Sequence, residues 1–188
     1  GSTGHVYIGN LTGNTIGSST TNGVINLVTS GTGSTSYGIK CASTSASTDT
    51  VRIQNNFVGG IQVSSSTATN GTNIHGIGVT TASYVYIENN LVGSLNNPNG
   101  IIASNNATSV QSVHGISVAS GTYSTVINNT IANLTNNYTG ASTGYTRGIY
   151  LTVSTTSVVT GNVVKNIASK STYTGTGTLA ALTGIQVS

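Results

Sequence analysis

Residues 51 to 61 read VRIQNNFVGGI, and the same phrase returns as VYIENNLVGSL over residues 85 to 95. Looser copies read STVINNTIANL over 124 to 134 and SVVTGNVVKNI over 157 to 167, and GNTIGS from Gly13 is a shortened one. Within each phrase apolar residues alternate with polar ones, which is the two-residue period of a β-strand with one buried face. Helical spacing is absent, so the phrase predicts short strands that recur along the chain.

A Gly-Ile pair recurs in the same way, with gaps of 38, 39, 33 and 36 residues between its copies. The glycines of the pair are Gly38, Gly76, Gly115, Gly148 and Gly184. Because equivalent strands return only after a whole repeat, they can stack in parallel, about 4.8 Å apart, whereas hairpins would need tight turns at short intervals. The repeats therefore predict an all-β fold, a parallel β-solenoid with loops of unequal length.

The G-I-x-V and V-x-I-x-N-N-x-V phrases resemble the coils of right-handed parallel β-helix, or pectin-lyase-like, repeats in large secreted and surface proteins of bacteria. The resemblance extends from about Val6 to the end of the chain. It implies about five coils with irregular loops, spanning about 24 Å along the axis. We expect residues 1–188 to form one repeat segment of a longer protein. The composition, which is rich in Ser, Thr and Asn, is similar to that of repeat regions in giant bacterial adhesins. That fold serves lyases, hydrolases, adhesins and stalks alike, so activity has to be argued from residues.

Charged residues make up only 4% of the chain, against about 25% in an average soluble domain. The five lysines and arginines are scattered, which leaves no electrostatic footprint for nucleic acid or anionic lipid. The apolar stretches are far shorter than the roughly 20 residues of a membrane span, so no membrane insertion is expected. The resemblance implies an extracellular or cell-surface location, and an export signal would lie outside these residues.

One column of asparagines is expected to be structural, because each copy of the long phrase places an asparagine at the same turn position. Asparagine tolerates left-handed backbone, and its amide can bond to the same amide on the next rung. The alternative is a polar row that binds a ligand. The members of this predicted ladder are Asn14, Asn56, Asn90, Asn129 and Asn162.

His75 and His114 each stand directly before a Gly-Ile pair, and Tyr37, Arg147 and Thr183 hold the same place in other repeats. Stacked rungs would bring the two imidazoles about 5 Å apart, close enough to share a metal ion. Arg147 on the next rung would oppose a cation, however, and no carboxylate or thiol occupies a neighbouring slot. We expect a column of stacked planar side chains, with no metal site and no cofactor.

Catalysis lacks the residues it needs. Carbohydrate-active enzymes of the fold that this chain resembles use carboxylates, and the only two here are Asp49 and Glu88. The two carboxylates belong to different repeats. For Glu88 the simpler expectation is a surface ion pair with Arg52 on the neighbouring rung. Cys41 takes the place of Val79 in its repeat and is expected to be a buried small hydrophobe. We therefore expect no catalytic residues and no enzymatic activity.

Tyrosines offer the clearest binding surface. Tyr37, Tyr86 and Tyr150 are expected at outward or corner positions, and Tyr138, Tyr145 and Tyr173 in loops, where their rings could stack on sugars. The alternative is that exposed tyrosines only cover neighbouring strands. A third reading is ice binding, suggested by the Thr-x-Thr pattern over residues 172–178. The candidate binding residues are Tyr37, His75, Tyr86, His114, Arg147 and Tyr150.

These observations favour a non-catalytic, extracellular structural or adhesive segment of a large bacterial surface protein, such as an adhesin stalk or filament. The alternatives are a carbohydrate-binding module and an ice-binding β-solenoid. Glycans and a cell or abiotic surface are the partners expected. End-to-end self-association is also expected, because the open sheet edges of the two terminal coils can pair with other strands.

Overall fold

The computed structural model describes residues 4–30, 33–42, 49–67, 69, 71–105, 108–119, 121–140, 142–152, 155–171 and 181–188. Every regular element in these residues is a β-strand, and the strands form three sheets. All the strand pairs are parallel. The prediction of an all-β parallel solenoid is confirmed.

Each sheet takes equivalent strands from successive repeats. Sheet A contains β1 (His5–Ile8), β5 (Thr50–Gln54), β9 (Tyr84–Glu88), β13 (Tyr123–Ile127) and β16 (Thr156–Thr160). Sheet B contains β2 (Thr15–Gly17), β3 (Ile25–Thr29), β6 (Phe57–Gly59), β7 (Ile61–Ser65), β10 (Leu91–Gly93), β11 (Ile101–Ser104), β14 (Thr130–Asn136) and β17 (Val163–Ser169). Sheet C contains β4 (Thr35–Ala42), β8 (Asn73–Thr81), β12 (Gln111–Val118), β15 (Gly144–Leu151) and β18 (Leu182–Val187).

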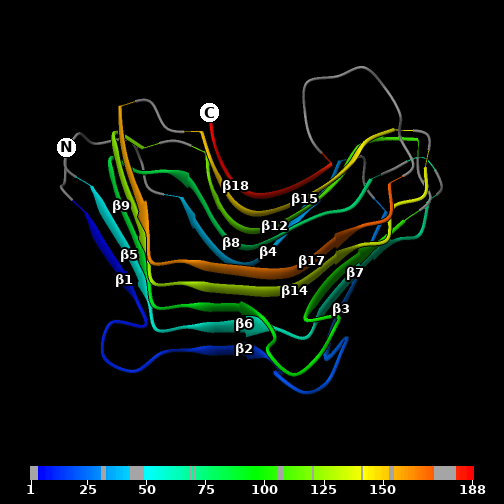
Figure 1. The fold of residues 1–188 in the computed structure, drawn as a ribbon, viewed down its shortest axis with the longest axis horizontal. Helices are drawn as coiled ribbons and strands as arrows, with labels where there is room; N and C mark the ends of the chain where they lie inside the picture. Colours follow the sequence, from blue (N-terminus) through cyan, green and yellow to red (C-terminus); the bar gives the residue numbers. More distant parts are fainter. Residues whose placement is uncertain are drawn as a thin grey trace.

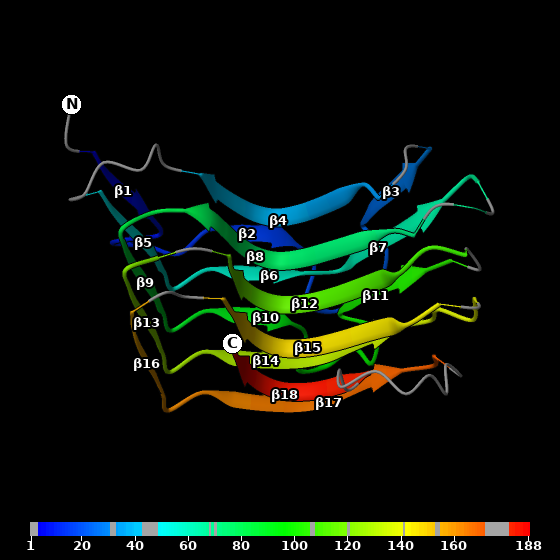
Figure 2. The same ribbon diagram turned by 90° about the horizontal axis from the view of Figure 1, so that it is seen from above.

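The chain winds from sheet A through sheet B to sheet C and then returns to sheet A one rung further along (Figure 1). The two perpendicular views show that this winding is right-handed (Figure 2), as in nearly all crossovers between parallel strands. The chain makes about four turns, so the expected number of about five coils is too high. Sheets A and C each contain five strands, and the four intervals between them span about 19 Å rather than about 24 Å.

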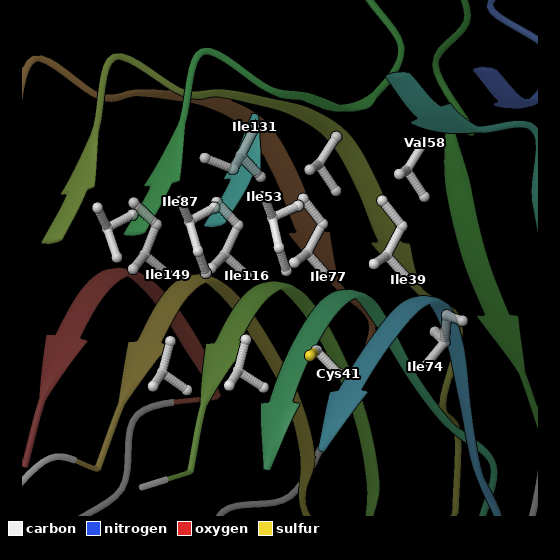
Figure 3. Packing of buried hydrophobic residues seen from close by; sticks show 14 of the residues in the cluster. Ile39, Cys41, Ile53, Val58, Ile74, Ile77, Ile87, Ile116, Ile131 and Ile149 are labelled. Atoms are coloured by element: carbon white, nitrogen blue, oxygen red, sulfur yellow. The ribbon is translucent and has the colours of Figure 1, made fainter. Parts of the chain in front are cut away.

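The interior is filled by columns of branched apolar side chains that run along the axis. Ile77, Ile116 and Ile149 from sheet C face Ile53 and Ile87 from sheet A (Figure 3), and none of the five is exposed. Because each rung places its isoleucine on the isoleucine of the rung before, one continuous core extends through the described rungs.

The strands of sheet C curve so that their outer side is concave (Figure 1), and each of them contains the Gly-Ile pair. A Cβ atom on Gly76 would lie 2.3 Å from Cγ1 of Val92 in sheet B and 2.8 Å from the carbonyl oxygen of Gly115. Gly115 is enclosed in the same way, with Cγ2 of Ile131 at 2.5 Å from its Cβ position. In the four copies before Gly184, the backbone of sheet C approaches the side chains of sheet B too closely for any side chain at the glycine.

Candidate functional site

The column that begins at Tyr37 lies on the concave outer side of sheet C. The strand register sets Tyr37 beside His75, His75 beside His114, and His114 beside Arg147. The rings of His75 and His114 are stacked, with 4.5 Å between their centroids and 20° between their planes. Tyr37 meets His75 edge-on, with centroids 5.1 Å apart. The repeated HGI phrase therefore builds one row of planar side chains along the solenoid.

Arg147 continues this row and is enclosed by aromatic rings. Its Cζ atom lies 4.5 Å from the ring centroid of Tyr145 and 4.5 Å from that of Tyr150, which precede and follow it on β15. Nη1 of Arg147 donates to Nε2 of His114 at 3.2 Å. Arg147 and His114 are each only 5% exposed, although they belong to an outer face. We call Tyr145, Arg147, Tyr150 and His114 the arginine cluster.

Both histidines of the column are held neutral. Burial lowers the pKa of His75 to about 4. Burial, followed by the charges of His75 and Arg147, lowers the pKa of His114 to about 2. Burial also lowers the pKa of Arg147, and Tyr150 and Tyr145 oppose that shift. At neutral pH the guanidinium is therefore the cation of this column, because both imidazoles are uncharged.

Two donors in the arginine cluster have no acceptor. Since Nε2 of neutral His114 accepts from Arg147, the ring carries its proton on Nδ1. That Nδ1 atom and Nε of Arg147 are both buried without a hydrogen-bond partner in the described part of the chain. Buried donors without acceptors are uncommon in folded proteins and call for a specific explanation.

A second aromatic surface covers the outer face of sheet A. The rings of Tyr84 and Tyr123 are stacked on adjacent rungs, 5.2 Å apart and 7° from parallel. The guanidinium of Arg52 lies 4.1 Å from the ring centroid of Tyr86. Tyr86 therefore belongs to a different sheet from Tyr37 and Tyr150, and the candidate binding tyrosines are divided between two faces.

The five asparagines at the turn after each sheet A strand form one hydrogen-bonded ladder. In each step the backbone N–H and Nδ2 of one asparagine donate to Oδ1 of the next, at 2.8 to 3.0 Å. Nδ2 of Asn90 also donates to the carbonyl oxygens of Ile53 and Glu88. Asn56, Asn90 and Asn129 are buried. The members of the ladder are Asn14, Asn56, Asn90, Asn129 and Asn162.

The left-handed backbone expected at the ladder lies one residue earlier. Asn55, Asn89 and Asn128 have φ angles of 60°, 56° and 55°, and Gly161 takes the equivalent place with 66°. The first asparagine of each pair thus turns the chain, and the second fills the ladder. The prediction assigned both tasks to the second asparagine because the sequence repeats the pair as a unit.

The residues that could act in catalysis are either buried or already engaged in hydrogen bonds with other groups of the chain. Cys41 is buried beside Val79, and burial raises the pKa of its thiol. Oδ1 of Asp49 accepts from the backbone N–H of Gly4 at 2.8 Å. The expected ion pair of Glu88 with Arg52 is wrong, because Glu88 accepts from Nε2 of Gln54 at 2.5 Å and Arg52 lies on Tyr86. Among the described residues no three His, Cys, Asp or Glu side chains gather into a possible metal site.

The loop tyrosines differ from expectation. Tyr138 does follow a strand, but its side chain is fully buried, and its hydroxyl accepts from the backbone N–H of Ser142. Tyr145 lies within β15. Tyr173 and the Thr-x-Thr pattern of residues 172–178 lie outside the described residues. Tyr84 and Tyr123 were missed, although both directly precede the repeated phrase and so occupy one column.

No protein-family model, curated protein or solved structure matches this chain. The described residues contain no helix long and apolar enough to cross a membrane. The chain is therefore described by its fold, a parallel β-solenoid.

Proposed function

We propose that the chain is a non-catalytic structural and adhesive segment of a large bacterial cell-surface protein, acting as a stiff β-solenoid in an adhesin stalk or filament. The observation that carries this proposal is the asparagine ladder, which passes from Asn14 to Asn162 through every turn. Because each ladder asparagine bonds to the asparagine of the next rung, the polar groups of this turn are satisfied without charged residues. The G-I-x-V and V-x-I-x-N-N-x-V phrases, which resemble pectin-lyase-like repeats, support the extracellular location.

Single-molecule stretching between two folded handle proteins tests the load-bearing role. A structural segment should unfold in one cooperative event, and Asn90→Ala should lower the unfolding force more than Asn14→Ala, because Asn14 is exposed at one end of the ladder. Gradual unravelling of single rungs at low force would contradict the proposal.

We further propose that this segment associates end to end along its axis. The terminal strands β16 and β18 pair on one side only, and the apolar residues of β18 lack the cover of another rung. Ile185 is 46% exposed and Val187 53% exposed, whereas Ile149 and Leu151 beside them on β15 are fully buried. Light scattering at increasing concentration should show a rising mass. A constant monomer mass would count against this part of the proposal.

Carbohydrate binding is a second candidate, and the outer face of sheet A favours it. Tyr123 is 43% exposed and Tyr7 52% exposed, and exposed aromatic faces are suited to stacking on sugar rings. A glycan array should detect binding that is lost in the double variant Tyr84→Ala, Tyr123→Ala. The variant Tyr150→Ala on sheet C is the matched control. Equal losses in both variants, or no binding at all, would reject sheet A as the glycan surface.

A further inference from the structure

We propose that Arg147 is the anchor of a binding site for an oxyanion, a carboxylate, sulfate or phosphate group that reaches the protein from the concave side of sheet C. The inference goes beyond the structural role proposed above and does not depend on it. It rests on a buried cation that the chain itself leaves without a counter-ion.

The sequence contains only two acidic side chains, and both lie at sheet A. Asp49 directly precedes β5 and accepts from Gly4, whereas Glu88 belongs to β9 and accepts from Gln54. No carboxylate side chain therefore neutralises Arg147, although the residue is only 5% exposed. A buried charge without a partner is strongly unfavourable, so a group from outside the chain can stabilise it.

The two tyrosine rings offset part of this cost. Tyr145 and Tyr150 hold the guanidinium at 4.5 Å from each ring centroid, and cation–π contacts stabilise a cation without neutralising it. The rings also fix the orientation of the guanidinium plane. A guanidinium that is already oriented loses little freedom when it binds a planar or tetrahedral oxyanion.

The hydrogen bonds of Arg147 show which edge is free. Nη1 donates one bond to His114, and Nε is buried without a partner. Nη2 makes no hydrogen bond with the described residues and is not among their fully covered atoms. The free edge therefore consists of Nη1 and Nη2, and an oxyanion can accept from both in the two-pronged geometry typical of arginine.

The neighbouring charges favour an anion. His75 and His114 are neutral and add no net charge, and Lys40 lies on the same sheet, three strands away from Arg147, with its Nζ 5.1 Å from the ring centroid of Tyr37. Sheet C thus carries two of the five cations of the chain and neither of its acids. His114 occupies the side of the guanidinium that faces β12, which leaves the approach from the concave face.

Isothermal titration with sodium sulfate and with dextran sulfate, at constant ionic strength, tests the site with a free and a polymer-borne oxyanion. We expect saturable binding of at least one probe that weakens at least tenfold in Arg147→Gln. Arg147→Lys, which retains the charge but not the planar fork, should also weaken binding. Arg52→Gln removes a cation that lies on a tyrosine of sheet A, so it should leave the affinity within about twofold of the wild type.

Each result decides the proposal. Binding of sulfate shows that the free ion suffices, and binding of dextran sulfate alone assigns the site to a polymer. Binding that survives in Arg147→Gln, or that falls equally in Arg52→Gln, would show only general attraction to a basic protein and would overturn the proposal. No binding of either probe would overturn it as well. If Arg147→Gln does not fold, the NMR signal of the Arg147 side chain in the wild-type protein must shift with sulfate while that of Arg52 does not.

Discussion

His75 and His114 stand one rung apart with their imidazole rings stacked, 4.5 Å between centroids. Such close contact disfavours a doubly charged pair, because two imidazolium ions at this distance would repel each other. The low pKa values of both rings, about 4 for His75 and about 2 for His114, agree with that arrangement. The repeated histidine thus reflects a repeated position in the coil, since His114 also contacts Arg147 where the next rung replaces histidine by arginine.

The stack predicts that stability falls as the solution becomes acidic. In the unfolded chain both histidines bind protons near pH 6.5, whereas in the folded protein they resist protonation down to about pH 4 and about pH 2. The unfolded state therefore binds more protons below pH 6.5, and the free energy of unfolding should decrease by up to about 1.4 kcal/mol per pH unit for each histidine.

Urea unfolding between pH 7 and pH 4.5 measures this slope. The double variant His75→Gln, His114→Gln should show a flatter dependence, and His5→Gln, which lies outside the column, is the control. Stability that stays constant or rises on acidification would show that the two rings are not buried as the structure places them.

The bend of sheet C makes a prediction about its glycines. Gly115→Ala should destabilise the protein by about 3 kcal/mol, because its Cβ would lie 2.5 Å from Cγ2 of Ile131 and 2.6 Å from the carbonyl oxygen of Gly148. Gly184→Ala provides the control, since no atom lies within 4 Å of the same position on β18. Thermal melting of both variants distinguishes them. Similar melting temperatures would mean that sheets B and C are not in close contact.

The left-handed backbone at Asn89 predicts that alanine and glycine at this position affect stability differently. Asn89→Ala should cost about 1 kcal/mol, because alanine is strained at the φ angle of 56° found there. Asn89→Gly should be nearly neutral, because glycine adopts this backbone conformation without strain. Gly161 already occupies the equivalent position in the turn after β16. Chemical denaturation gives both values. A greater loss with glycine than with alanine would show that the Asn89 side chain, rather than its backbone, matters.

The sequence predicts the columns better than it predicts their surroundings. Repeated phrases locate His75 beside His114 and Cys41 beside Val79, because parallel rungs place equivalent residues next to each other. It cannot show that Arg52 turns to Tyr86 and away from Glu88, because side-chain contacts across a sheet depend on rotamers that no repeat encodes.

The sequence also does not predict which residues of the outer face are buried. Strict alternation would place Arg147 on the same side as Ile149 and Leu151. However, Gly148 and Ile149 both face the core, so the phase changes there. Arg147 therefore lies on the outer face, where the rings of Tyr145 and Tyr150 cover it. Tyr138 is buried as well, because a residue in a loop can fold back against the core. Curvature and loop packing are tertiary properties, and a two-residue period carries no information on them.

The measurement that separates a structural ladder from a functional column is the unfolding free energy of Asn90→Ala beside that of His114→Ala. Asn90 accepts from the N–H and Nδ2 of Asn56 and donates to the carbonyl oxygen of Ile53, all of which lose a buried partner in the variant. We predict a loss of at least about 2 kcal/mol for Asn90→Ala, and a smaller one for His114→Ala. Asn14→Ala, at the exposed end of the ladder, should also cost less. If His114→Ala were the more destabilising change, the asparagine ladder would not be what holds the rungs of this solenoid together.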